Sequence, residues 1–389
     1  MLSPANELAY SQQAISKYQP RRPFDFSARA NLFELAAHLD ESTSNEPLLT
    51  QHLIDQFERL IRRDPGRRGL ISSEPQFGRL CDGHLKLAAM HLAEQGSSVA
   101  IVTGFFIPRA DPPAAETDGP LGALMLAKLL EQAGLTTCII TDRHCIHAIQ
   151  VGAEFVEYAP EQVIECQEPA FEWCQDFVES DVGRELTHLI AIERAGPSHT
   201  LESFIAQPRY SDPPHDDFET QVPPDARNRC HNMRGAIIDQ HTIELHHLFE
   251  IARIARPELR TIGIGDGGNE IGMGTIAWED IARRLPGESS GRIVCRIATD
   301  WTIIAGTSNW GGYALAAGVL SELGRTELLR DWNQTHQLEL LNHIVREGPA
   351  VDGITALAEA TVDALPFATY IQPWESMRRL MALDDRDPS

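Results

Sequence analysis

The chain has 389 residues, of which 42% are hydrophobic and 23% charged, the balance of a globular protein with a large buried core. Its formal net charge of −23 comes from 56 acidic against 33 basic side chains. Such a field repels nucleic-acid phosphates and anionic lipid, so we expect neither nucleic acid nor a membrane as a partner. A homodimer stays compatible with the sequence.

The cysteines and the N-terminus indicate a reducing compartment. The seven cysteines include no C-x-x-C pair, and their number is odd. Reduced, mostly buried thiols therefore fit better than a disulfide framework or a thiolate zinc site. No run approaches the ~20 apolar residues of a membrane helix. Met1–Glu7 also lacks the charged start of a signal peptide, and together these features predict a cytoplasmic protein.

The first part of the chain has helical apolar spacing. This spacing predicts helices over Asn31–Leu39 and His52–Ile61, the second ending at Asp64-Pro65-Gly66. We expect residues 1–75 to form a helical N-terminal segment. A further amphipathic helix is predicted over Leu85–Leu92.

From Ser97 onward, short apolar runs alternate with helical patterns. The expected strands are Val99–Thr103, Cys138–Thr141, Phe155–Tyr158, Leu189–Ile192, Thr261–Ile264 and Ile293–Ala298. Such runs, separated by helices such as Pro120–Ala133, predict an α/β fold: a mostly parallel sheet with helices on both faces. We assign residues 76–325 to this α/β core and residues 326–389 to a helical C-terminal segment.

One stretch of the core breaks the pattern. Residues 207–229 carry five prolines and many acids without apolar periodicity. Structureless stretches of this length are usually lids or insertions, and we expect a mobile insertion that contributes few apolar groups to the core.

Acidic residues follow five of the expected strands. In chain order they are Glu116 and Asp118, Asp142, Glu193, Asp266 with Glu270, and Asp300. The carboxyl ends of parallel strands share one edge, where open sheets bind ligands. A single acid at such a place is usually a helix cap, but five together favour a ligand site. Oxygen ligands without Cys or His partners suit Mn²⁺ or Mg²⁺, and we expect no nucleotide or organic cofactor.

Two glycine-rich runs allow more than one interpretation. Gly263–Gly268 formally matches the dinucleotide pattern G-x-G-x-x-G. It continues into Asn269–Gly274 with more glycine than a helix opening tolerates, so a metal-bridged carboxylate site fits better. Ser308–Gly312 precedes a helix and is either an anion site or an ordinary helix cap. We interpret four histidines as surface or structural residues: His144, His147, His246 and His247.

Several of these runs together resemble the D-glutamate cyclase family. The matching runs are Val102–Phe105, Glu116–Pro120, Ala191–Arg194, Asn232–Gly235, Ile264–Gly274 and Ser308–Tyr313. The resemblance extends from about Asp64 to Gly324, and the long, proline-rich stretch 207–229 departs from it. It implies cyclisation of D-glutamate to 5-oxo-D-proline with loss of water, helped by a divalent metal.

The lactam-forming reaction can be assigned to individual residues. The expected metal ligands are Glu116, Asp118, Asp266 and Glu270. The expected catalytic residues are Asp300 or Glu193 as the base and Asn269 as an orienting donor. The expected substrate-binding residues are Thr117, Arg194, Asn232, Arg234, Ser308 and Asn309, with Arg194 or Arg234 clamping the α-carboxylate. Two other functions stay open: a metal-dependent phosphohydrolase for a small phosphorylated metabolite, and an amino-acid-binding protein without catalysis.

Overall fold

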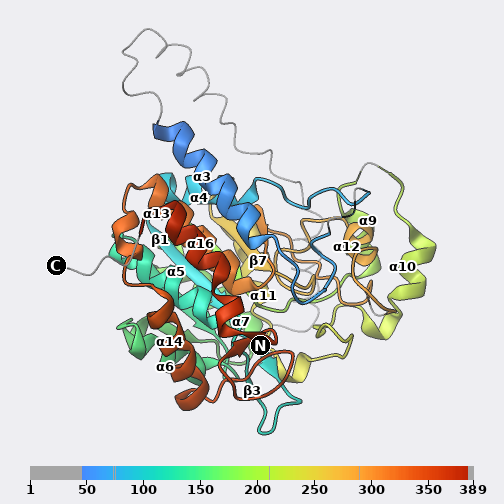
Figure 1. Ribbon diagram of the computed structural model, residues 1–389. Helices are drawn as coiled ribbons and strands as arrows, with labels where there is room; N and C mark the ends of the chain where they lie inside the picture. Colours follow the sequence, from blue (N-terminus) through green and yellow to red (C-terminus); the bar gives the residue numbers. More distant parts are fainter. Residues whose placement is uncertain (1–45, 73, 75, 210, 289, 384–389) are drawn as a thin grey trace, which may run out of the picture.

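A six-stranded parallel sheet lies at the centre of the molecule (Figure 1). The computed structural model describes residues 46–383 apart from 73, 75, 210 and 289, so the helix expected over Asn31–Leu39 lies outside the described residues. The strands of this sheet are β1 (Ser98–Thr103), β4 (Thr136–Thr141), β5 (Val163–Glu165), β6 (His188–Ile192), β7 (Arg260–Gly265) and β8 (Trp301–Ile304). Every neighbouring pair is parallel, which confirms the expected fold class.

The strand order creates a switch point in the middle of the sheet. The order is β5-β4-β1-β6-β7-β8, so the chain builds one half outward from β1 and the other half outward from β6. These two strands pair directly, with Val102 opposite Ala191 and Thr103 opposite Ile192. The loops that follow β1 and β6 diverge from each other, and open α/β sheets bind ligands in the crevice between such loops.

Helices cover both faces of the sheet and bury a core on each. The core on one face includes residues from α3 (Glu46–Ile61), α4 (His84–Gln95), α5 (Pro120–Gln132), α6 (Ile146–Phe155), α13 (Ser308–Glu322), α14 (Gln334–Glu347), α15 (Phe367–Tyr370) and α16 (Gln372–Leu380). The core on the other face includes residues from α7 (Ala170–Glu179), α9 (Leu201–Ala206), α10 (His215–Gln221), α11 (His246–Ala255) and α12 (Trp278–Ala282), and the short α8 (Asp181–Glu185) follows α7. Alternate side chains of β1 point to opposite faces of the sheet. Val99 and Ile101 pack into the first core, and Ala100 and Val102 pack into the second.

Three helices expected from apolar spacing are confirmed as α3, α4 and α5. The C-terminal part is less helical than expected, because residues 348–366 form a loop with a short hairpin, β9 (Thr361–Val362) and β10 (Leu365–Pro366). A second hairpin, β2 (Phe106–Ile107) with β3 (Ala114–Ala115), lies between β1 and α5. Within the described residues, no helix combines the length and apolarity needed to cross a membrane.

Two expected strands are wrong. Phe155–Tyr158 ends α6 and forms a turn, in which Tyr158 is buried with its hydroxyl 2.9 Å from Thr137 Oγ1. Ile293–Ala298 is irregular and takes part only in isolated bridges, and the sixth strand is β8 instead. In both places apolar side chains are buried in the core without belonging to a sheet. From a short apolar run alone, such a buried segment cannot be distinguished from a strand.

The stretch 207–229 contributes more to the core than expected. It contains α10, which buries Phe218 and places Val222 directly after it, also buried. Phe218 stacks on Phe204 with ring centroids 4.2 Å apart. Phe218 and Val222 are four positions apart and cover one face of a single helical turn. Two residues are too few to produce an apolar periodicity in the sequence. Figure 1 shows α9, α10 and α12 grouped to one side of the sheet.

Candidate active site

Three carboxylates from separate loops converge at the switch point. Asp118 precedes α5, Glu193 follows β6 and Asp266 follows β7. Each offers an oxygen atom within 4.8 Å of the others, and all three side chains are buried. The expectation that acids after different strands share one edge of the sheet therefore holds for this trio.

The first turn of α13 holds two members of this trio in place, Asp118 and Glu193. Asp118 accepts hydrogen bonds from the backbone N–H groups of Ser308 and Asn309, both at 2.8 Å, at the start of α13. The hydroxyl of Ser308 donates to Glu193 Oε2 at 2.5 Å. Because the N-terminus of a helix carries partial positive charge, this position favours carboxylates.

Asn309 joins the starts of α5 and α13. Its Oδ1 accepts from the N–H groups of Gly119 and Gly122, at 2.9 and 2.8 Å, and its Nδ2 donates to the carbonyl of Thr117 at 3.1 Å. A Cβ on Gly312 would lie only 3.0 Å from the Cα of Gly122, so glycine permits the close approach of the two helices. Asn309 therefore positions the loop that carries Asp118.

Glu270 shapes the glycine-rich turn after β7. Its Oε1 accepts from the backbone N–H groups of Asp266 and Gly267 at 3.0 and 2.6 Å, and its Oε2 accepts from that of Gly268 at 2.7 Å. The run does not open a helix as a dinucleotide loop does, since the next helix, α12, begins only at Trp278. Both oxygens of Glu270 are thus engaged in holding the turn that presents Asp266.

Two further carboxylates border the trio. Glu116 and Asp363 are buried, and Glu116 Oε1 and Asp363 Oδ2 have no hydrogen-bond partner among the described residues. Asp363 lies in the two-residue turn between β9 and β10, where Asp363 and Ala364 both have positive φ, 54° and 60°. Sequence reasoning missed Asp363 because it lies beyond the predicted sheet, in a segment expected to be helical.

One arginine lies among these acids and was also missed. The guanidinium of Arg68 makes ion pairs with Asp266 and with Asp363, the latter at 2.5 Å. The carboxylate of Asp64 accepts from the N–H groups of Arg68 and Gly69, each at 2.8 Å, and so fixes the turn that carries Arg68. An arginine in a polar turn normally indicates a solvated surface. The only sequence signal for a role of Arg68 in the site was its place beside Asp64-Pro65-Gly66, where the family resemblance begins.

The crowded carboxylates change each other's proton affinity. Burial and the neighbouring Glu193 raise the pKa of Glu116 well above its ordinary value, and burial and Glu270 do the same for the pKa of Glu193. Burial and Asp363 raise the pKa of Asp118 to about 8. Burial opposes the charge on Arg68, but the surrounding carboxylates outweigh it and raise the pKa of Arg68. Without a bound cation the site therefore favours uptake of protons, because its carboxylates outnumber the guanidinium of Arg68.

These residues fit a hard divalent cation. The converging donors are all carboxylate oxygens, and two bordering oxygens lack a partner among the described residues. Carboxylates outnumber the guanidinium of Arg68 here, so a divalent cation can replace protons as the neutralising charge. Asp118, Glu193 and Asp266 could hold such an ion directly, with Glu116 beside them.

Several predicted substrate-binding side chains are engaged elsewhere. Arg194 is buried and donates to Asp142 at 2.5 Å and to the carbonyls of Gly104 and Ile243. The Oδ1 of Asn232 accepts from the N–H groups of its own turn, and the hydroxyl of Thr117 donates to the carbonyl of Thr361 at 2.8 Å. These three side chains therefore organise loops around the site.

Asn269, Arg234 and Asp300 have different positions. Asn269 donates to the carbonyl of His231 at 2.8 Å, while its buried Oδ1 lacks a partner among the described residues. Arg234 is exposed. Asp300 precedes β8 and accepts from the N–H and hydroxyl of Thr261, at the start of β7, so it lies at the opposite edge of the sheet. The structure does not bring Asp300 to the trio, because the strand expected before it does not exist.

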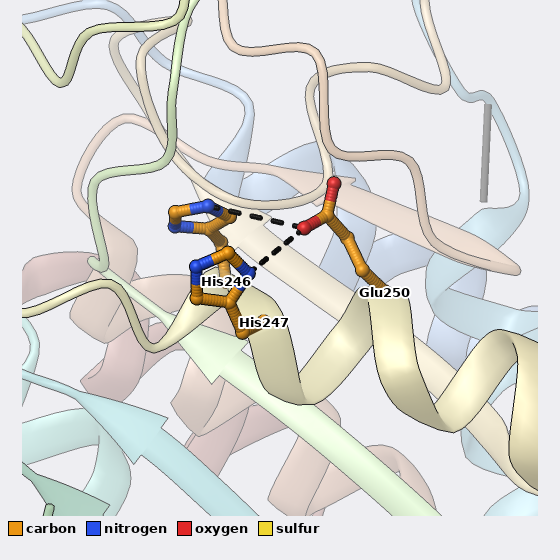
Figure 2. Close-up of side chains that lie close together, drawn as sticks. All are labelled: His246, His247 and Glu250. Atoms are coloured by element: carbon orange, nitrogen blue, oxygen red, sulfur yellow. Dashed lines mark hydrogen bonds and ion pairs between the residues drawn. The ribbon is translucent and has the colours of Figure 1, made fainter. Parts of the chain in front are cut away.

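A second group of potential metal ligands lies at the start of α11 (Figure 2). His246 Nε2 and His247 Nδ1 lie 3.9 and 3.1 Å from Glu250 Oε2, while Arg296 binds Glu250 Oε1 at 2.5 Å. The guanidinium and the positive end of the helix both disfavour a cation here. Burial and His247 lower the pKa of His246 well below its ordinary value, which disfavours a positive charge on this imidazole. We interpret the group as a structural ion-pair network.

The fold and the carboxylate trio define a doubly wound α/β protein with a candidate ligand site at its topological switch point. A family model described as D-glutamate cyclase-like, C-terminal, matches residues 57–202 and 221–378, and the chain belongs to this family. The human mitochondrial D-glutamate cyclase is 31% identical over 277 residues, which cover 68% of this chain. The chain spans 38% of the length of that relative. The family match omits residues 203–220, which include the first part of the stretch that departs from the pattern.

Proposed function

We propose that this protein is a hydro-lyase that converts D-glutamate to 5-oxo-D-proline and water. Family membership and the name of the human relative support this proposal, although the relative is much longer. The observation that carries it is the buried trio of Asp118, Glu193 and Asp266 at the switch point. The free state of all seven cysteines supports the further proposal of a reducing, cytoplasmic location.

We propose that a divalent ion, Mn²⁺ or Mg²⁺, binds to Asp118, Glu193 and Asp266. Of the four predicted ligands, this assignment keeps Asp118 and Asp266, replaces Glu270, whose oxygens hold the turn, by Glu193, and leaves Glu116 beside the ion. When bound, such an ion would polarise the substrate's γ-carboxylate as a Lewis acid. The role of Glu270 as a ligand stays a prediction that a substitution described below tests.

Two exposed arginines in loops near the carboxylates are suited to bind the α-carboxylate, Arg109 and Arg234. Arg109, in the loop between β2 and β3, donates to the carbonyl of Gly353 at 2.8 Å, and Gly353 packs directly against the carboxylate of Glu116. Arg234 follows Met233, whose sulfur lies against Gly267 in the turn after β7. Both guanidinium groups are exposed, unlike Arg194, and guanidinium groups bind carboxylates with two hydrogen bonds.

Glu116 is suited to move the protons. The reaction forms a bond between the amine nitrogen and the γ-carbon and breaks one carbon–oxygen bond. The ammonium group loses two protons, which leave with the departing oxygen as water. A carboxylate with a raised pKa and an unpartnered oxygen can accept a proton from the ammonium and return it to that oxygen. Holding the curled substrate between these arginines and the trio would remove much of the entropic barrier.

The two alternative functions make different demands on the site. A phosphohydrolase would use free N–H groups at the helix starts, but those of Ser308 and Asn309 bind Asp118. Those of Gly119 and Gly122 bind Asn309. A binding protein without catalysis would need no proton acceptor beside the trio. The carboxylate cluster therefore favours the cyclase.

The decisive assay is incubation with D- or L-glutamate and Mn²⁺, followed by chiral detection of 5-oxoproline. We expect 5-oxo-D-proline from D-glutamate and no product from L-glutamate above the spontaneous rate. A phosphomonoester panel under the same conditions serves as a control. Phosphate release without oxoproline would replace the cyclase by a phosphohydrolase, and thermal stabilisation by glutamate without product would indicate a binding protein.

A further inference from the structure

Arg68 occupies the carboxylate cluster as a built-in counter-ion. Its guanidinium pairs with Asp266, a member of the trio, and with Asp363, which borders it. Only 15% of the Arg68 side chain is exposed. A positive charge therefore already lies on one of the three carboxylates that we propose as ligands of a divalent ion.

The backbone that carries Arg68 is firmly attached. Asp64 binds the N–H groups of Arg68 and Gly69. Just before this turn, the N–H of Gly306, at the carboxyl end of β8, donates to the carbonyl of Ile61 at 2.9 Å. Gly69 has a φ of 90° and packs against the carbonyl of Arg284, a position that a side chain could not share. The backbone of this turn is thus held on several sides. If the carboxylates bind an ion, we expect the long side chain of Arg68 to move and its backbone to stay in place.

A guanidinium and a divalent ion cannot both neutralise Asp266 without strong mutual repulsion. Like charges a few Å apart repel strongly where water is scarce. When an ion takes Asp266, the guanidinium keeps Asp363 as a partner. The Arg68 side chain is partly exposed, so it is not enclosed on every side.

We infer that Arg68 and the divalent ion are alternative counter-ions of Asp266, and that Arg68 sets the affinity of the site for the ion. In the ion-free protein Arg68 holds the carboxylates together. Ion binding displaces its guanidinium from Asp266 while Asp363 retains it. This inference rests on the proposed ion site and adds a residue that competes with the ion from within the chain.

The test is a calorimetric titration with Mn²⁺ of the metal-depleted full chain and three variants. Removing the competitor in Arg68→Gln should tighten Mn²⁺ binding by about tenfold or more. Arg68→Lys, which keeps the charge but offers no planar fork, should lie between wild type and Arg68→Gln. Arg67→Gln, at the exposed neighbouring arginine, should bind Mn²⁺ as the wild type does.

Melting temperatures in chelator give a second readout. Arg68→Gln should melt below the wild type without ions, because its carboxylates lose their counter-ion, and Mn²⁺ should stabilise it more than it stabilises the wild type. Should Arg68→Gln fail to fold without ions, Arg68→Lys provides the affinity comparison. Equal or weaker Mn²⁺ binding by both Arg68 variants would overturn the competition while leaving the ion site intact. Absence of Mn²⁺ binding in every variant would overturn both the ion site and the competition.

Discussion

At the scale of single residues, the buried carboxylates of the site differ in their hydrogen-bond partners and therefore in their roles. Asp118 receives two backbone N–H groups from α13, and Glu270 receives three from its own turn. Glu116 and Asp363, by contrast, each keep a buried oxygen without a partner among the described residues. The N–H groups orient Asp118 for the proposed ion and hold the turn of Glu270, and the second pair remains able to bind a ligand or a proton.

Replacing Asp266 by Asn tests the proposed ion ligand. Asn keeps the shape but removes the negative charge, so turnover should fall by about two orders of magnitude or more. The melting temperature should change little, because carboxylate repulsion falls as the pair with Arg68 is lost. Kinetics at saturating Mn²⁺ together with thermal melting provide the measurement. Near-normal turnover would remove Asp266 from the site.

Replacing Glu270 by Gln separates turn formation from ion binding. In Gln one of the two accepting oxygens is replaced by an NH₂ group, which cannot accept a hydrogen bond from the N–H groups of the turn. The free energy of unfolding should therefore fall by about 1.5–3 kcal/mol. Denaturant unfolding measures this loss, and Mn²⁺ titration of the folded variant is the companion experiment. Unchanged stability with lost Mn²⁺ binding would show instead that Glu270 is a ligand.

At the scale of elements, regular apolar runs were predictable and irregular ones were not. β1 and β6 are buried on both faces, and their continuous apolar sequences indicated this directly. β5 has only three residues at the edge of the sheet and no distinctive pattern. The segment around Val294 and Cys295 is buried like a strand but is irregular, so its composition was misleading.

The same physical reason explains which site residues were predicted. Asp118, Glu193 and Asp266 lie in loops that begin at strand ends, and a parallel sheet places those ends on one edge. Asp300 was misplaced together with its strand. Arg68 and Asp363 reach the site from segments outside the sheet, through tertiary contacts that no local pattern encodes.

The helix α10 should be required for stability although its sequence resembles a loose insertion. Phe218→Ala should lower the free energy of unfolding by about 3 kcal/mol or more, because it leaves a cavity between Phe204 and Trp278. Asp217→Ala, at the exposed neighbouring position, should change it by about 0.5 kcal/mol or less. Equal stability of the two variants in denaturant would contradict the packing described here. The mobility of residues 207–229 as a whole stays a prediction.

At the scale of the whole molecule, the doubly wound topology brings together loops distant in the sequence. The segment before α4, the loops after β1, β6 and β7, and the hairpin near the C-terminus all meet at the switch point. Family membership covers these parts of the chain, residues 57–202 and 221–378. The net charge of −23 is spread over the whole fold, and six of its buried carboxylates gather at this one place: Glu116, Asp118, Glu193, Asp266, Glu270 and Asp363.

The most direct test of the proposed activity follows product formation against bound metal. Metal-depleted protein should convert no D-glutamate above the spontaneous rate, and added Mn²⁺ should restore 5-oxo-D-proline formation in proportion to the ion bound at the trio. Chiral product analysis and metal analysis on the same samples provide both quantities. Undiminished formation of 5-oxo-D-proline after exhaustive chelation, with no metal in the protein, would contradict an ion-assisted cyclase.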